Sequence, residues 1–321
     1  MSSKCNTMTL PVGLAALAAL AAAACASAQD DDAAQWRLVP ETTLSAMLDC
    51  LEGEGRSLVS AHRGGPSPGL PENAISTMDA VLAAIPAVME VDVAATSDGV
   101  LFLMHDDTLD RTTTGTGEAS AKEWAEIETL RLVDSAGWVT PYTVPSLAEA
   151  LDWARGRTVL QLDFKRSASY ADVIDMVRDK GMEGSVILIA YSVPSAKTLH
   201  DLAPGAMISL SVESPGALAE AVEAGIPAER IIAFTGTRLA RPDLYAALDD
   251  ADVEVIFGTL GRSQGSIDNV IARFGTDERY AELSRGGVDV IATDRPREAA
   301  AALAEAERLP EAGMCGVRRG E

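Results

Sequence analysis

VLQLDFKRSASYADVIDMVRDKGMEGSVILIAYSVPSAKTLHDLA, residues 159–203, is the stretch that decides the fold. Two short β-rich runs, at 158–164 and 186–190, alternate here with two amphipathic helical segments, at 170–181 and 195–203. Alternation of this kind is typical of βα units arranged around a parallel sheet. The stretch therefore predicts an α/β protein.

The same alternation continues in both directions along the chain. Eight β-rich runs are present, at 58–61, 88–92, 158–164, 186–190, 207–212, 230–235, 253–259 and 288–293. Helical patterns follow at 73–85, 146–156, 170–181, 195–203, 216–225, 241–250, 266–274 with 280–287, and 297–309. Eight strands that are each followed by a helix favour a single (β/α)8 TIM barrel over an open doubly wound sheet. No Gly-rich dinucleotide fingerprint follows the first strand, which further weakens the open-sheet interpretation.

One apolar run, Val100–Met104, follows the second strand too closely for a helix to intervene. The preceding Ser97-Asp98-Gly99 is a hairpin signal. If the chain folds back about the Asp98–Gly99 bond, Asp92 faces His105. We therefore expect a β-hairpin outgrowth after the second strand, followed by a loop or short insertion over residues 106–145.

The N-terminal region has the features of an export signal. An apolar run at 10–24 lies behind Lys4 and is followed by Ala26-Ser27-Ala28, a pattern typical of a cleavable secretory signal over residues 1–28. The run is shorter than the roughly 20 residues that a membrane-spanning helix needs, so no stable membrane span is expected. Residues 29–321 then form one barrel domain, exported to the periplasm or secreted. Lipid attachment at Cys25 is a weaker alternative, because the usual leucine three residues earlier is missing.

The formal net charge of −22 limits the classes of partner. A surface of this charge repels nucleic acid and anionic lipid head groups, so no nucleic acid partner is expected. An anionic small molecule would have to be attracted by a local concentration of positive charge. The oligomeric state is left open.

Two cysteines, Cys50 and Cys315, flank the predicted barrel. In a closed barrel the chain enters the first strand and leaves the last helix at the same end, so the two thiols could meet. Export permits a disulfide. Two unrelated free thiols are the equal alternative.

Polar residues gather at the predicted carboxyl ends of the strands, where barrel active sites form. They are His62 and Arg63 after the first strand, Glu90 and Asp92 in the second, Asp163 and Lys165 in the third, and Asp294 after the eighth. In the second and third strands, residues two apart share a face of the sheet.

Three of the four acids in this set, Glu90, Asp92 and Asp163, would repel one another unless protonated or bridged by a cation. Oxygen ligands suit one divalent ion, Mg²⁺ or Ca²⁺, and no cluster of cysteine and histidine indicates zinc. We assign these three acids to that metal. Arg63 and Lys165 are candidates to bind the oxygens of a substrate phosphate.

Histidine titrates near neutral pH and can serve as a general acid or base. Two of the three histidines, His62 and His105, end strands that converge at this site. They are the candidate acid and base, in an order that the sequence does not fix. The third, His200, lies on a predicted helix and is interpreted as structural.

Other polar and aromatic residues have a purely structural interpretation beside any functional one. Glu72-Asn73 can equally cap the helix that begins there. Arg111 can belong to a solvated loop, and Trp124 and Trp138 can pack within the insertion.

Taken together, the motifs resemble those of the glycerophosphodiester phosphodiesterase family. They are HRG at 62–64, PEN at 71–73, E-x-D at 90–92, HDDTLDRTT at 105–113, VPSL at 144–147, D-x-K at 163–165 and GVDVIATDRP at 287–296. The resemblance implies a barrel enzyme that uses a divalent metal and two histidines to hydrolyse glycerophosphodiesters to glycerol 3-phosphate and an alcohol. It also implies a route in which a neighbouring glycerol hydroxyl attacks phosphorus first.

Two departures from the family pattern stand out. Glutamate is more usual where Asp163 stands, so this metal ligand is one methylene shorter, and Ala74 replaces a common threonine. Two other functions remain as alternatives: a phosphatidylinositol-type phospholipase C, which would need apolar surface at the mouth, and a non-catalytic periplasmic barrel that binds phosphodiesters.

Overall fold

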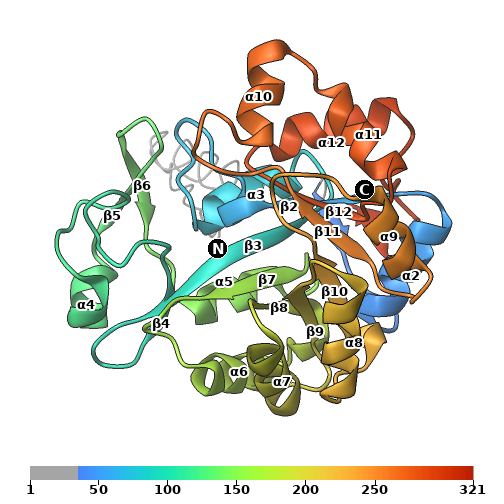
Figure 1. The fold of residues 1–321 in the computed structure, drawn as a ribbon. Helices are drawn as coiled ribbons and strands as arrows, with labels where there is room; N and C mark the ends of the chain where they lie inside the picture. Colours follow the sequence, from blue (N-terminus) through green and yellow to red (C-terminus); the bar gives the residue numbers. More distant parts are fainter. Residues whose placement is uncertain (1–34, 321) are drawn as a thin grey trace, which may run out of the picture.

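The structure, a computed structural model, describes residues 35–320 and contains a closed barrel of parallel strands (Figure 1). The barrel strands are β2 (Leu58–Ala61), β3 (Ala87–Ala95), β7 (Leu160–Phe164), β8 (Val186–Ala190), β9 (Met207–Ser211), β10 (Ile231–Phe234), β11 (Val255–Gly258) and β12 (Val290–Thr293). They pair in this order, and β12 pairs with β2 to close the sheet. The predicted (β/α)8 barrel and all eight of its strands are confirmed.

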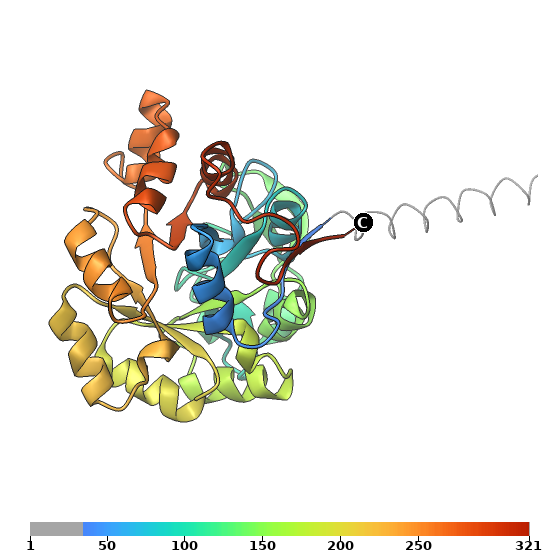
Figure 2. The ribbon, with the colours of Figure 1, turned by 90° about the vertical axis from the view of Figure 1, so that its right-hand side faces the viewer.

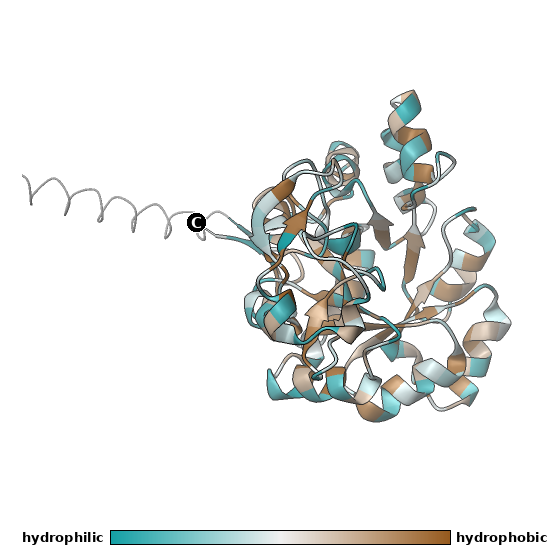
Figure 3. Cartoon of the chain, turned by 90° about the vertical axis from the view of Figure 1, so that its left-hand side faces the viewer, coloured by the Kyte–Doolittle hydropathy of each residue, from teal (hydrophilic) through white to brown (hydrophobic). Residues whose placement is uncertain are grey.

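Helices between the strands form the outer ring. They are α3 (Ile75–Leu82), α5 (Leu147–Ala154), α6 (Tyr170–Asp179), α7 (Val193–Leu202), α8 (Pro215–Glu223), α9 (Pro242–Asp249), α10 (Ile267–Phe274) with α11 (Glu278–Arg285), and α12 (Pro296–Glu305). Serine side chains cap the amino ends of four of them, α5 to α8. Each helix carries both hydrophilic and hydrophobic residues (Figure 3). Helices that lie between the core and water need one face of each kind. Single turns η3 (Glu183–Ser185) and η4 (Ala228–Arg230) precede β8 and β10.

Inward-facing side chains change character along the strands. Near the amino ends they are apolar and form one buried cluster, which includes Leu58, Val88, Val159 and Met207. Two residues further along stand Ser60, Glu90, Gln161 and Ser209, and Ser60 donates a hydrogen bond to Gln161 at 2.9 Å. Because strand side chains alternate between faces, the next inward positions reach the open mouth. The pattern therefore places an apolar plug below and a polar floor above.

The amino end of the barrel is closed by segments from both ends of the described chain (Figure 2). Helix α2 (Leu44–Gly53) packs Leu44, Met47, Leu48 and Leu51 into the apolar interior cluster. Strands β1 (Trp36–Leu38) and β13 (Val317–Arg319) pair antiparallel beside it. This small sheet was not predicted.

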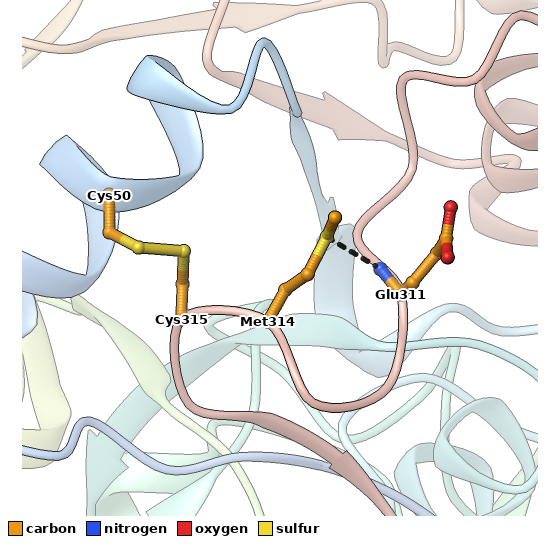
Figure 4. The surroundings of a disulfide bond; sticks show 4 residues. All are labelled: Cys50, Glu311, Met314 and Cys315. Carbon is orange, nitrogen blue, oxygen red and sulfur yellow. Dashed lines mark hydrogen bonds between the residues drawn. A yellow bond between two sulfur atoms is a disulfide. The ribbon is translucent and has the colours of Figure 1, made fainter.

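Cys50 on α2 and Cys315 in the C-terminal loop form a disulfide, so one of the two alternatives for these cysteines is confirmed (Figure 4). Beside it, the backbone N–H of Glu311 donates to the sulfur of Met314. The disulfide joins the C-terminal segment to α2, the helix that closes the amino end of the barrel.

The predicted hairpin is present, with β4 (Leu101–Leu103) antiparallel to β3, but its expected register is wrong by one residue. Val93 faces Leu103, and the Met104 N–H donates to the Asp92 carbonyl at 2.9 Å, so Asp92 lies opposite Met104 and not His105. The turn contains three residues instead of two. Its last residue, Gly99, has a φ of +85°, a conformation that glycine favours in such loops.

Residues 106–145, expected to form a loop or short insertion, are a folded insertion whose apolar side chains form a buried cluster with residues of the β3–β4 hairpin such as Ala94 and Phe102. Its elements are η2 (Ala119–Ala121), α4 (Trp124–Ile127), β5 (Arg131–Val133) and β6 (Val139–Thr143), the last two forming an antiparallel pair. Trp124 packs on Phe102 with ring centroids 6.1 Å apart, as its structural interpretation predicts. Trp138 does not pack there, since it is 72% exposed.

Within residues 35–320, no helix is both long enough and apolar enough to cross a bilayer. The predicted signal, residues 1–28, and the alternative lipid attachment at Cys25 lie outside the described residues.

Candidate active site

The first strand delivers His62 and Arg63 to the mouth through a sharp turn, η1 (His62–Gly64). Arg63 has a φ of +53°, which is rare for a residue with a side chain, and Gly64 and Gly65 follow with φ of +79° each. A Cβ on Gly64 would lie 2.7 Å from Met78, and one on Gly65 would lie 2.8 Å from Pro296. The two glycines are thus required by both conformation and space, and they hold a strained residue of the kind found at functional sites.

Glu90, Asp92 and Asp163 converge beside this turn. Asp92 on β3 is directly opposite Asp163 on the neighbouring strand β7, and Glu90 precedes Asp92 on the same face. One carboxylate oxygen from each residue lies within 4.8 Å of the others, and all three residues are buried. The predicted carboxylate cluster is therefore present.

Neighbouring charges shift the pKa values of Glu90 and Asp92 in opposite directions. Burial and the adjacent Asp92 raise the pKa of Glu90 to about 7. Burial alone would raise the pKa of Asp92 too, but the Lys165 ammonium, with Nζ 2.5 Å from Asp92 Oδ1, lowers it below its ordinary value. Lys165 Nζ also lies 2.6 Å from Asp163 Oδ2. The cluster thus attracts positive charge.

The donor set fits a hard divalent cation. It consists of carboxylate oxygens alone, and Mg²⁺ and Ca²⁺ prefer oxygen ligands. The shorter Asp163 is held in place by the Tyr191 hydroxyl, which donates to its Oδ1 at 2.9 Å. Glu90 accepts the backbone N–H of Arg63 at 2.7 Å, so the strained turn orients a second member of the set.

His62 is oriented by Asp294, which follows β12. His62 Nδ1 and Asp294 Oδ1 are 2.6 Å apart, which leaves Nε2 directed toward Glu90 at 4.0 Å. Burial opposes the charged imidazolium, but the bond to Asp294 and the charge of Glu90 outweigh it and raise the pKa of His62. This carboxylate–imidazole pair resembles those of general acid–base sites.

His105 is held in the same manner from the insertion. Its Nδ1 is 2.7 Å from Asp106 Oδ1, and burial lowers the pKa of His105 against the opposing charges of Asp92 and Asp106. The two histidines are therefore shifted in opposite directions, a difference that suits an acid and a base acting at one pH.

A chain of ion pairs links the insertion to the barrel. Arg111 bonds Asp106 through Nε at 2.5 Å and Glu72 through Nη1 at 2.7 Å. Glu72 in turn accepts from Arg63 Nη1 at 3.0 Å. Arg111 is exposed and does not line the cavity, so it fits a solvated loop, but it also connects that loop to Glu72.

The capping role considered for Glu72-Asn73 is also wrong. The N-cap of α3 is Ala74, whose methyl group accepts no hydrogen bond, so the departure from threonine there removes a possible cap. Asn73, with a φ of +55°, instead donates Nδ2 to Asp92 at 2.7 Å and accepts the Asp92 N–H at 3.0 Å. It fixes the orientation of a candidate metal ligand.

A cavity of about 1050 Å³ joins these groups at the mouth. All seven residues singled out from the sequence line it: His62, Arg63, Glu90, Asp92, His105, Asp163 and Lys165. His200 is not among the lining residues. The residues predicted from motifs scattered along the sequence therefore surround a single cavity.

The sequence interpretation missed the residues that orient this set: Asn73, Asp106, Tyr191 and, as the partner of His62, Asp294. Asp106 and Asp294 belong to the motifs HDDTLDRTT and GVDVIATDRP quoted above. Their place in these motifs was the available signal. Tyr191 directly follows β8 at the carboxyl end of the barrel, which was the only indication of its place.

Three exposed apolar or aromatic side chains lie on the insertion or on loops that follow barrel strands, and one of them, Tyr191, lines the cavity. Trp138, Tyr191 and Leu239 are 72%, 67% and 71% exposed and belong to the insertion or to loops that follow barrel strands.

Comparison with known proteins bears on this geometry. Residues 62–198 match the sequence model of the "Glycerophosphoryl diester phosphodiesterase family". A glycerophosphodiester phosphodiesterase of Bacillus subtilis (strain 168) is 28% identical over 171 residues, which are 46% of this chain and 57% of the relative. The match thus spans less than two thirds of that curated relative's length.

Solved structures extend the likeness over most of the chain. A glycerophosphoryl diester phosphodiesterase from Parabacteroides distasonis ATCC 8503 is 30% identical with a TM-score of 0.75, covering 86% of this chain and 95% of that one. An Oleispira antarctica phosphodiesterase, solved in complex with the product sn-glycerol-3-phosphate, is 21% identical with a TM-score of 0.58, covering 78% and 98%. At this identity the second likeness concerns the fold alone.

Proposed function

The chain belongs to the glycerophosphoryl diester phosphodiesterase family, and on that premise we propose that it hydrolyses glycerophosphodiesters to glycerol 3-phosphate and an alcohol. One divalent cation, Mg²⁺ or Ca²⁺, bound by Glu90, Asp92 and Asp163, is part of the proposal. The observation that carries it is the meeting, in one cavity, of this carboxylate cluster with two carboxylate-bound histidines.

The histidines supply the proton transfers. The oxygen that attacks phosphorus, from water or from the neighbouring glycerol hydroxyl, gives its proton to one imidazole Nε2. The bond from phosphorus to the alcohol oxygen breaks, and the other imidazole protonates that oxygen. Attack by water gives glycerol 3-phosphate directly. Attack by the glycerol hydroxyl gives a cyclic phosphate, which a second attack by water opens to glycerol 3-phosphate. In both histidines the carboxylate on Nδ1 keeps Nε2 directed away from it and stabilises the imidazolium.

The remaining groups bind charge. The cation, when bound, polarises the phosphoryl group and offsets the negative charge that develops on it. Arg63, a planar fork, and Lys165, a point charge, are placed beside the acids and are proposed to hold phosphate oxygens. The product found in the Oleispira antarctica neighbour, sn-glycerol-3-phosphate, is the product proposed for this chain.

Export is part of the same proposal. It is supported by the pattern at residues 1–28 and by the Cys50–Cys315 disulfide, since such bonds persist in oxidising compartments. Residues 29–321 would then act as a single exported domain.

The test measures release of glycerol 3-phosphate from glycerophosphocholine, glycerophosphoethanolamine and glycerophosphoglycerol. EDTA should abolish release, and Mg²⁺ or Ca²⁺ should restore it. Full turnover in the chelator would contradict the metal assignment. Binding of all three compounds without hydrolysis of any would favour the non-catalytic phosphodiester-binding barrel.

The exposed Trp138, Tyr191 and Leu239 favour a second candidate, a phospholipase C-like enzyme that acts on phosphatidylinositol in a membrane. Phosphatidylinositol vesicles and soluble glycerophosphocholine separate the two activities. Greater turnover of the vesicles would make this second function the primary one.

A further inference from the structure

The cations that line the reaction cavity differ in whether a carboxylate already holds them. Arg63 pairs with Glu72, and Lys165 pairs with Asp92 and Asp163. Arg295 Nη1 lies 2.7 Å from Asp277. Each of these cations is already paired with an acid of the protein.

Arg262 is different. It lines the same cavity in the loop between β11 and α10, and within residues 35–320 its exposed guanidinium has no ion pair and no hydrogen bond. In a chain with a net charge of −22, a cation that no carboxylate has captured is available to an anion from solution.

The loop that carries Arg262 is fixed on both sides of it. The N–H of the preceding Gly261 donates to Asp294 Oδ2 at 2.9 Å, and the other oxygen of Asp294 is bonded to His62. Asn269 Nδ2 donates to the carbonyls of Gly261 and Ser263 at 3.1 and 2.9 Å. The arginine is thus presented on a rigid support, on the His62 side of the cavity.

The cavity also has room for a large substrate. Its volume of about 1050 Å³ is at the upper end of the range for drug-sized ligands and exceeds the size of a glycerophosphoryl group. The alcohol portion can therefore extend along the wall that Arg262 belongs to. A guanidinium binds a carboxylate or phosphate with two parallel hydrogen bonds.

We propose that Arg262 forms an anion subsite, which binds a second negatively charged group in the alcohol portion of the glycerophosphodiester. The subsite rests on the proposed hydrolase function and adds a substrate preference to it: diesters whose alcohol carries a phosphodiester or a carboxylate, ahead of those whose alcohol is neutral or cationic.

The test compares bis(glycerophospho)glycerol, whose alcohol portion contains a second phosphodiester, with glycerophosphoglycerol, whose alcohol is neutral. Glycerophosphoserine tests the carboxylate as the second anion. In Arg262→Gln the ratio of kcat/KM for the doubly anionic substrate to that for glycerophosphoglycerol should fall about fivefold, as for a solvent-exposed ion pair. Arg262→Lys should retain part of the preference.

Arg166 offers a matched control, since it is exposed in the loop after β7, does not line the cavity, and has no ion pair or hydrogen bond within residues 35–320. Arg166→Gln should leave the ratio unchanged. An unchanged ratio in Arg262→Gln, or an equal fall in Arg166→Gln, would overturn the subsite. Calorimetry measures binding of the same compounds and therefore tests the subsite even if none of them is hydrolysed. Absence of hydrolysis would overturn the proposed function and leave the subsite to be judged by binding.

Discussion

Both ends of the barrel bury carboxylates, but the two groups of acids meet different surroundings. At the mouth, Glu90, Asp92 and Asp163 direct oxygens to one point and have Lys165 beside them. At the amino end, Glu254 and Asp289 directly precede the last two barrel strands, near Glu52 on α2. Of these two groups, only the mouth residues converge closely enough to form a candidate ion site in the part of the chain described.

At the amino end, burial favours the protonated form of the acids instead. Burial, with a nearby Asp49 carboxyl, raises the pKa of Glu254 to about 9. Burial also raises the pKa of Asp289 to about 6 and that of Glu52 to about 7. The difference teaches that burial of acids does not make a cation site, whereas convergence of their oxygens beside positive charge does.

The mouth is tested most strongly by Glu90→Gln, which removes one ligand charge without changing size. We expect kcat/KM to fall by a factor of about 10³ or more, because a bound metal contributes several kcal/mol to charge stabilisation. The increase in Tm on adding Mg²⁺ or Ca²⁺ should also disappear, since a ligand stabilises only the state that binds it.

The matched control for Glu90→Gln is Glu254→Gln, the same change at the other end of the barrel. It should keep both the activity and the metal-dependent rise in Tm. Loss of activity in both variants would mean that the two groups of acids are not functionally distinct.

The closure of the amino end is tested by Cys50→Ser combined with Cys315→Ser. Removing a cross-link between residues 265 apart should lower the free energy of unfolding by about 3 kcal/mol, within the usual range for native disulfides. Denaturant unfolding measures the loss, and kcat at a temperature well below Tm should not change. A large fall in kcat in the folded variant would show that the two ends are coupled.

At the mouth, His105→Ala should lower kcat about a hundredfold, the usual effect of losing a general acid or base. Its Tm should stay within a few degrees of the unchanged protein, because His105 is only half-buried and is not part of the apolar core. His200→Ala is the control on a helix away from the cavity and should keep full activity. Equal losses in both variants would argue against a catalytic role for His105.

The smallest expected effect is the pH dependence of the free energy of unfolding that Glu254 causes at the amino end. Below the ordinary carboxyl pKa near 4.5, Glu254 is protonated in both the folded and unfolded states. Between that pH and about 9 the unfolded state ionises while the folded state keeps its proton, so the free energy of unfolding falls as pH rises.

Glu254→Gln should remove this part of the fall and raise stability at pH 8 by about 2 kcal/mol, while changing it little at pH 4. Chemical denaturation at the two pH values measures the difference. A variant that is less stable at pH 8 would show that the Glu254 carboxylate is favourable in the folded state.

The hydrophobic pattern predicted the barrel well, because each strand and helix can be recognised from its periodicity over a few residues. The β3–β4 register could not be read in this manner, since it depends on whether the turn holds two residues or three. In the structure Thr96 decides this, donating its hydroxyl to Asp98 at 2.6 Å and accepting the Val100 N–H at 2.9 Å. The β1–β13 pair was missed because its strands are short and lie at opposite ends of the chain.

The candidate site was predicted as far as residue type and strand face determine it. Glu90, Asp92 and Asp163 follow from alternation along strands, which fixes the side on which a residue lies. The partners Asp106 and Asp294 depend on side-chain torsions and on loops, which periodicity does not constrain. A histidine's function is decided by such partners, so orientation was the part of the site that sequence alone left undetermined.

The disulfide has a consequence for proteolysis. Residues 50 and 315 enclose every strand and helix of the barrel, so the covalent path through the barrel is a closed ring. A single cleavage by a protease in any surface loop of the ring leaves the two fragments joined through sulfur. The nicked molecule would run as one band on a non-reducing gel and as two bands after reduction.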